Sequence, residues 1–202
     1  LPVSWAREMC IRDRVFIVAL GRVAKGNPAQ AAEILSSNTL LLNKKQEAQG
    51  WAQIALQASM KLAPEAVDYW RKAGNAPLSL EGHQWKIRAA LRAGDWKLVK
   101  QGVEAMPPAL RDDAAWTYWL ARALREEGKR DEANVLMQSI ASQTNFYGQL
   151  ALEELGQKIT IPPRATPVTE EEIAPMAANH GFRRAFKFFD LGLRFEGYRE
   201  WN

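Results

Sequence analysis

Apolar residues recur along this chain at the three- and four-residue spacing of helices that bury one face. Two equivalent stripes lie 68 residues apart: Ala48, Trp51, Ala52, Ala55 and Leu56, then Trp116, Trp119, Leu120, Ala123 and Leu124. No run of alternating apolar and polar residues predicts a strand. We therefore expect an all-α protein, with helices near residues 13–25, 28–36, 44–59, 64–73, 78–93, 95–105, 112–127, 130–142 and 145–155.

The helical pattern repeats every 34 residues, because Trp51, Trp85 and Trp119 stand at that interval. A period of this length is typical of tetratricopeptide-like repeats, in which each unit is a hairpin of two helices. One hairpin cannot bury its apolar face alone, so successive hairpins stack. The fold class that we predict is a tetratricopeptide-like superhelix of helical hairpins.

Glycines mark the turns of this repeat. Gly26, Gly94 and Gly128 share one phase, with Met60 as the exception. Glycine adopts at little cost the left-handed conformation that ends many helices. An alanine follows five residues after Gly26 and after Gly128, where we expect the second helix of a hairpin to approach the first closely.

A proline-rich segment interrupts the helical pattern. Residues 157–168 contain three prolines and no apolar stripe, which predicts an extended linker. Thr169 and Glu172 have the spacing of a capping box, so a new helix is expected to begin there. We predict four segments: residues 1–14, by hypothesis partly non-native or disordered; a superhelix over 15–156; a linker over 157–168; and the truncated beginning of a small helical linker domain over 169–202.

The second unit carries an aromatic stripe at helical spacing. Its members are Phe182, Phe186, Phe189 and Leu193. We expect Gly197 to end this helix before another at 198–201. Basic residues alternate with the phenylalanines, but the helical phase separates them onto another face, which favours a core stripe over a nucleic-acid surface.

Composition excludes several classes of function. The chain has 202 residues, 47% hydrophobic and 25% charged, which is ordinary for a globular protein, and its net charge of +4 comes from mixed signs that do not indicate nucleic acid. The longest apolar run, residues 15–20, is too short to span a membrane. Cys10 has no partner for a disulfide, and His83 and His180 lack ligands at metal-binding spacing. No metal or other cofactor is expected.

Two sequence phrases resemble a known family. FYGQLALEELG, Phe146 to Gly156, follows two tryptophan-rich hairpins and precedes the proline-rich segment, and LGLRFEGYREW, Leu191 to Trp201, lies in the second unit. In this order they resemble the soluble lytic murein transglycosylases of the bacterial periplasm. In that family a U-shaped helical superhelix ends with a phrase like the first, and the second is similar to the opening hairpin of the linker domain that follows.

The resemblance implies an enzyme that cleaves the β-1,4 bond between N-acetylmuramic acid and N-acetylglucosamine in peptidoglycan, closing a 1,6-anhydro ring without water. One carboxylic acid protonates the leaving oxygen and then accepts a proton as the carboxylate. The family holds that glutamate in a Glu-Ser pair of a later, lysozyme-like domain, and this sequence contains no such pair. We therefore expect a fragment with no catalytic residue, located in the periplasm, with peptidoglycan glycan strands and cell-wall proteins as its partners.

Tryptophans are the candidate contacts for glycan, because an indole face stacks on a sugar ring. Trp51, Trp116 and Trp119 stand in apolar stripes, which favours core packing. Trp70 and Trp96 fall outside the cleanest stripes. These two are the substrate-binding residues that we predict.

Two functions remain compatible with the sequence. The first is the scaffold of a lytic transglycosylase, which holds glycan strands for a catalytic domain outside these residues. The alternative is a tetratricopeptide-like protein–protein adaptor with no catalytic role, whose groove binds a peptide or a partner helix. The gene sequence that follows Asn202 would distinguish them, by the presence or absence of a Glu-Ser pair.

Overall fold

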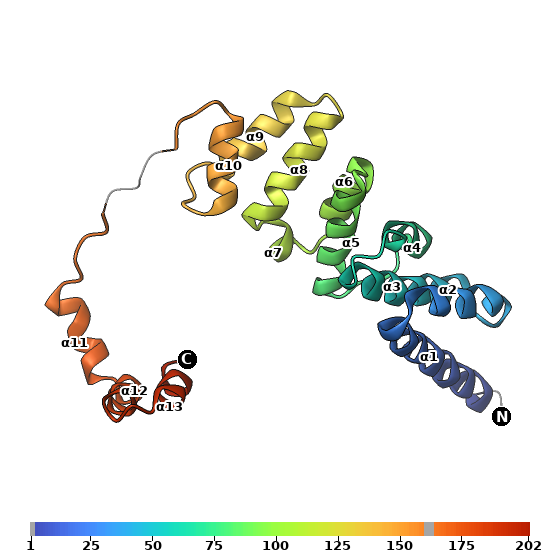
Figure 1. Cartoon of the computed structure of the whole chain (residues 1–202), viewed down its shortest axis with the longest axis horizontal. Helices are drawn as coiled ribbons and strands as arrows, with labels where there is room; N and C mark the ends of the chain where they lie inside the picture. Colours follow the sequence, from blue (N-terminus) through green and yellow to red (C-terminus); the bar gives the residue numbers. More distant parts are fainter. Residues whose placement is uncertain (1–2, 160–163) are drawn as a thin grey trace. The chain divides into compact units, whose positions relative to one another are not determined.

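The computed structural model describes the backbone of residues 3–159 and 164–202, and the side chains of 15–159 and 164–202. About three quarters of the chain is helical, and the described residues form no strand (Figure 1). The all-α prediction is confirmed. The chain divides into two compact units, Leu1–Ile159 and Thr160–Asn202.

Unit 1 is a row of helical hairpins in which each hairpin packs on the next. The hairpins are α1 (Val3–Gly26) with α2 (Pro28–Ser37), α3 (Lys44–Met60) with α4 (Ala66–Ala73), α5 (Leu80–Ala93) with α6 (Trp96–Glu104), and α8 (Ala114–Glu126) with α9 (Arg130–Ile140). α10 (Phe146–Glu154) packs on α8 and α9. Neighbouring hairpins join through α1 on α3, α3 on α5 and α6 on α8. This arrangement is the predicted superhelix of hairpins.

Some elements differ from the expected ones. α1 begins at Val3, well before residue 13. The side chains of residues 3–14, that of Cys10 among them, lie outside the described ones. Two short elements, η1 (Thr39–Leu41) and α7 (Pro108–Arg111), were not expected. An element of three or four residues is too short to show a helical period, so no stripe could indicate it.

Left-handed residues end four of the helices in unit 1. Gly94, Gly128 and Gly156 have φ values of 68°, 81° and 72°. The residue after each donates a backbone hydrogen bond to the carbonyl five residues before it, which closes the helix end. The prediction of a left-handed turn at Gly26 was wrong, because Gly26 has no positive φ and is the last residue of α1. After α3 the same turn is made by Leu62, with φ 56°.

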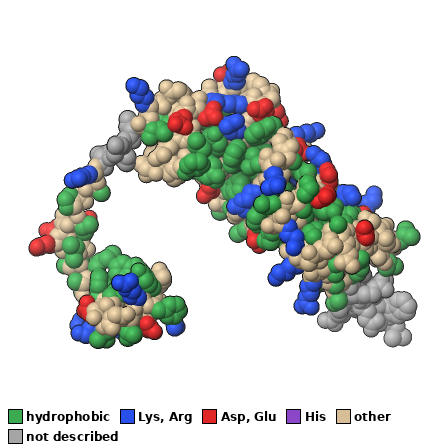
Figure 2. All heavy atoms as spheres, in the orientation of Figure 1, with side chains coloured by type: hydrophobic (Ala, Val, Ile, Leu, Met, Phe, Trp, Pro, Cys, Tyr) green, Lys and Arg blue, Asp and Glu red, His purple; other side chains and the backbone are tan. Residues whose placement is uncertain are grey.

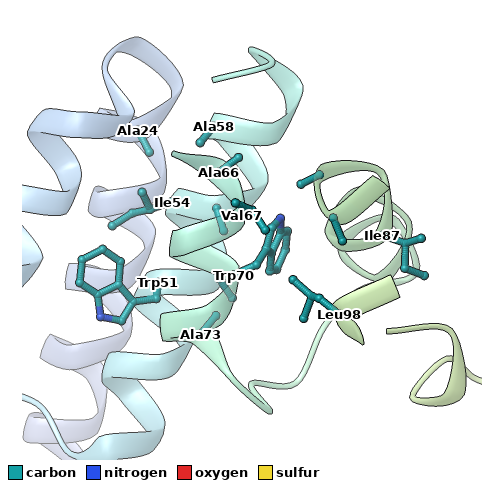
Figure 3. Packing of buried hydrophobic residues seen from close by; sticks show 14 of the residues in the cluster. Ala24, Trp51, Ile54, Ala58, Ala66, Val67, Trp70, Ala73, Ile87 and Leu98 are labelled. Carbon is teal, nitrogen blue, oxygen red and sulfur yellow. The ribbon is translucent and has the colours of Figure 1, made fainter. Parts of the chain in front are cut away.

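The core of unit 1 lies between the hairpins. Ala31 and Ala133 are completely buried, as the close approach of the paired helices requires. Trp70 of α4 is buried in one cluster with Ile87 of α5 and Leu98 of α6 (Figure 3). Residues of three consecutive helices therefore belong to one continuous core.

Unit 2 contains three helices: α11 (Glu170–Ala178), α12 (His180–Asp190) and α13 (Arg194–Trp201). The capping box at the start of α11 is present, with Thr169 and Glu172 each accepting the other's backbone N–H. The prediction that Gly197 ends a helix was also wrong, because Gly197 lies inside α13. A side chain at Gly197 would overlap the ring of Phe189, so this glycine serves close packing between α12 and α13.

Much of the apolar surface of unit 2 is exposed, and some of it is visible in Figure 2. Only Ala185 and Gly197 are buried among its described residues. Across both units, no helix of the described chain combines the length and apolar content needed to cross a bilayer.

Candidate functional site

Trp70 does not meet the requirement for a glycan contact. Its side chain is only 1% exposed, and its indole N–H donates to Ser59 Oγ at 2.8 Å. A ring enclosed on both faces cannot stack on a sugar, so the expectation of an exposed ring at Trp70 is corrected. The sequence did contain a signal for this burial, because Ala66, Val67, Trp70 and Ala73 form a buried stripe on the short helix α4.

Trp96, the other predicted residue, is half-buried at the start of α6. Asp95 caps this helix by accepting the backbone N–H of Leu98 at 3.0 Å, which fixes the position of the first turn. The Trp96 ring lies 6.4 Å from the ring of Trp119 of α8, at an interplanar angle of 34°. Trp119 is also half-buried. The two rings form a partly exposed aromatic surface between α6 and α8.

A cation lies beside this aromatic surface. The guanidinium of Arg122, one helical turn after Trp119, lies 5.9 Å from the centre of the Trp96 ring. Its Nη1 donates to Tyr118 Oη and to Glu154 Oε1, both at 3.1 Å. These contacts hold the guanidinium against the ring, so Arg122 is a positioned and not a freely moving donor.

The charges around Arg122 are balanced by Glu154 of α10. Arg125 also forms an ion pair with Glu154 and donates to the Glu154 backbone oxygen at 3.1 Å. The hydrogen bond to Tyr118 and the neighbouring carboxylates raise the pKa of Arg122 above its ordinary value. Glu154 therefore forms ion pairs with two cations at once.

The aromatic surface continues from Trp119 to α10. The Tyr118 ring lies 5.3 Å from Trp119 and 5.7 Å from Tyr147, and Tyr147 lies 5.3 Å from Phe146. Apolar side chains gather around α8 in the view of Figure 2, with charged groups among them. We call the set Trp96, Trp119, Arg122 and Tyr147 the aromatic platform. It offers ring faces and a fixed cationic donor, the groups that bind sugar rings and hydroxyls.

The sequence missed three members of the platform. Trp119 was assigned to the core, although Trp119 and Arg122 stand at the i, i+3 spacing that places them on one face of α8. Tyr147 lies in the family-like phrase, but nothing in that phrase indicated its contact with α8. The described residues contain no group of three side chains suited to hold a metal ion.

Comparisons with known sequences give a partial match. No protein-family model matches the chain. It is 28% identical over 76 residues to a soluble lytic murein transglycosylase of Salmonella typhimurium, and 27% identical over 73 residues to one of Escherichia coli K12. These alignments cover 38% and 36% of this chain but only 12% and 11% of the relatives. The chain thus matches a small part of the relatives' length.

Solved structures match over almost the whole chain. Lytic transglycosylase Slt of Pseudomonas aeruginosa, an inactive mutant, gives a TM-score of 0.70 at 23% identity, over 92% of this chain and 31% of that one. The 70-kDa soluble lytic transglycosylase of Escherichia coli gives a TM-score of 0.59 at 20% identity, over 92% of this chain and 30% of that one. A 70-kDa soluble lytic transglycosylase in complex with bulgecin A is similar too. Unit 1 thus has the superhelical fold of lytic transglycosylases. The proteins that this chain resembles are soluble lytic murein transglycosylases, which confirms the resemblance drawn from the two phrases.

Proposed function

We propose that this chain is the helical scaffold of a lytic transglycosylase, which positions glycan strands of peptidoglycan for cleavage of the MurNAc–GlcNAc β-1,4 bond. The cleavage is made by a domain outside these residues. The observation that carries this proposal is the 28% identity over 76 residues to a soluble lytic murein transglycosylase. The proposal includes the predicted division into a superhelix over 15–156, a linker over 157–168 and a second helical unit.

In this proposal the aromatic platform is the part of unit 1 that contacts glycan. A partly exposed indole offers apolar ring surface to a sugar, and Arg122 is held where it can donate to a hydroxyl or an acetamido oxygen. The second predicted residue, Trp96, keeps its role, and Trp119 takes the place of Trp70.

The chain by itself contributes no acid for the reaction. It has no Glu-Ser pair, and Glu154, the carboxylate nearest the platform, is bound by Arg122 and Arg125. We expect the purified chain to release no 1,6-anhydro products from peptidoglycan, as measured by mass spectrometry of digested sacculi. Authentic anhydro products would mean that a catalytic acid has been missed. The location proposed for the protein is the periplasm, where its substrate lies.

Binding to purified sacculi tests the scaffold role. We expect the chain to sediment with sacculi and Trp96→Ala to lose most of that binding, because the exposed ring face is removed. Trp201→Ala is the matched control, since Trp201 is a 48% exposed tryptophan of unit 2 outside the platform. No binding by the unaltered chain would overturn the scaffold role, and equal loss in both variants would overturn the platform.

A further inference from the structure

A cavity separate from the platform lies between α5 and the turn that joins α3 to α4. Its volume is about 180 Å³, and its walls are mainly apolar, including Ala63, Val67, Trp85 and Ala89. An apolar cavity of about 150 Å³ is large enough for benzene. This cavity therefore admits one small apolar group and not a sugar chain.

Two arginines line this cavity, and no acidic residue does. Arg88 and Arg92 are both exposed and stand one helical turn apart on α5. Among the described residues neither is paired with a carboxylate. Arg88 is held in place by the rings of Trp85 and Trp116, at 5.1 and 5.5 Å, and it donates to Gln84 at 3.1 Å. An anion at the cavity would meet two cations that no carboxylate among the described residues neutralises.

Leu62 adds a second observation at the same place. It lines the cavity and has φ 56°, whereas glycine makes the equivalent turn after α5, α8 and α10. A left-handed conformation costs a leucine roughly 1–2 kcal/mol relative to its preferred regions. Strain of this kind is concentrated at ligand-binding sites. Here the strained residue places a large apolar side chain at the cavity, where a glycine would leave it open.

We propose that this cavity binds the free C-terminus of a short peptide whose last residue has a small apolar side chain. The apolar walls hold that side chain, and Arg88 and Arg92 bind the carboxylate, since guanidinium groups match carboxylate geometry. The site uses no residue of the aromatic platform. It can therefore be present or absent whether or not the chain binds glycan.

Titration calorimetry with N-acetyl-alanyl-alanine tests the proposal, with the C-terminal amide of the same dipeptide as the matched ligand. We expect the acid to bind and the amide to bind at least about tenfold more weakly, because only the acid carries the charge. The D,D and L,L isomers are both measured. A preference for D,D assigns the site to peptides of the cell wall and a preference for L,L to protein C-termini, and either supports the site.

Three variants complete the experiment. Arg92→Gln should weaken binding of the acid about tenfold without disturbing the fold, since Arg92 is exposed. Ala93→Leu should abolish binding by filling the cavity from an exposed position. Arg22→Gln is the control, an exposed arginine on α1 away from the cavity. Absence of binding by the acid, equal binding of acid and amide, or equal loss in Arg92→Gln and Arg22→Gln would each overturn the proposal.

Discussion

Single residues in this protein differ in role although they share a type. Trp70 is buried, and its N–H has a partner in Ser59, which itself donates to Ala55 O at 2.7 Å. The ring of Trp119 lies 6.4 Å from that of Trp96, tilted by 34°, and keeps part of its surface exposed. A buried indole needs such a partner, because an unpaired N–H in the core costs free energy. Burial and hydrogen bonding thus separate a structural tryptophan from a candidate for binding.

Among the tryptophans whose side chains the structure describes in unit 1, Trp70 should be the one whose replacement by alanine destabilises the protein most. We expect a loss of about 3–5 kcal/mol in the free energy of unfolding, as for other large aromatic truncations in cores. Trp119→Ala, for which the sequence alone predicts a loss of that size, should now cost less because Trp119 is only half-buried. Urea unfolding of both variants measures this. An equal or larger loss for Trp119→Ala would show that the assignment of the two residues is reversed.

Leu62→Gly should stabilise the protein. Glycine removes the strain of the left-handed backbone, and the expected gain is about 1 kcal/mol after its greater entropy loss on folding is included. Leu62→Ala is the matched control, since it shortens the side chain but keeps a Cβ in the strained conformation. If both variants lost stability equally, the packing of the Leu62 side chain and not the backbone would dominate at this turn.

At the scale of elements, one carboxylate joins two helices. Asp95 caps α6 and forms an ion pair with Arg71 of α4, Nη2 to Oδ2 at 2.7 Å. Burial raises the pKa of Asp95, but the hydrogen bond from Leu98 N–H and the pairing with Arg71 outweigh it, so its pKa is lowered below 3.8. The contact therefore stabilises the fold when Asp95 is ionised.

Asp95→Ala should cost about 1 kcal/mol at neutral pH through loss of the cap, and Asp95→Asn should cost less because the amide oxygen can still accept. A lowered carboxylate pKa gives stability that is present above the ordinary value and lost as the pH falls through the lowered one. The difference between wild type and Asp95→Asn should thus disappear in acid. Thermal melts from pH 7 down to about pH 2, below the ordinary carboxylate range, test this, and a difference that grew toward low pH would exclude the ion pair as its source.

The sequence predicted the long helices well, but it misassigned the roles of some single residues in them and in the short helices. α3 and α8 were predicted almost to the residue because each carries a complete apolar stripe. Gly197 was taken for a helix end because a glycine needed for close packing and a glycine that ends a helix look alike in one sequence. Trp70 was placed on the surface because the buried stripe of α4, Ala66, Val67, Trp70 and Ala73, is short and was not recognised. Contacts between neighbouring helices carry information that the periodicity lacks.

At the scale of the whole molecule, the division between residues 159 and 160 falls inside the segment predicted as a linker. Described residues on both sides of it, 157–159 and 164–168, are not helical, and Pro162 and Pro163 lie outside the described residues. A segment with few backbone hydrogen bonds opens at lower free energy than the helices beside it. The linker is therefore the expected weak point of the chain.

Limited trypsin digestion should cut first between Gln157 and Thr169, at Lys158 or Arg164, and leave a stable unit 1. The released piece should then be degraded, because Ala185 and Gly197 are its only buried described residues. The fragments can be assigned by mass spectrometry. First cuts within residues 44–142 would instead describe one continuous solenoid without this boundary.

The central claim is that unit 1 binds glycan through the aromatic platform. The most direct measurement is a nuclear magnetic resonance titration of the indole N–H signals, in protein labelled with ¹⁵N-tryptophan, with soluble murein glycan strands. We predict that the signals of Trp96 and Trp119 shift, that Trp70 in the core does not, and that Trp85 at the separate cavity responds only to the dipeptide acid. Unchanged Trp96 and Trp119 signals at saturating glycan, or shifts confined to other tryptophans, would contradict the account.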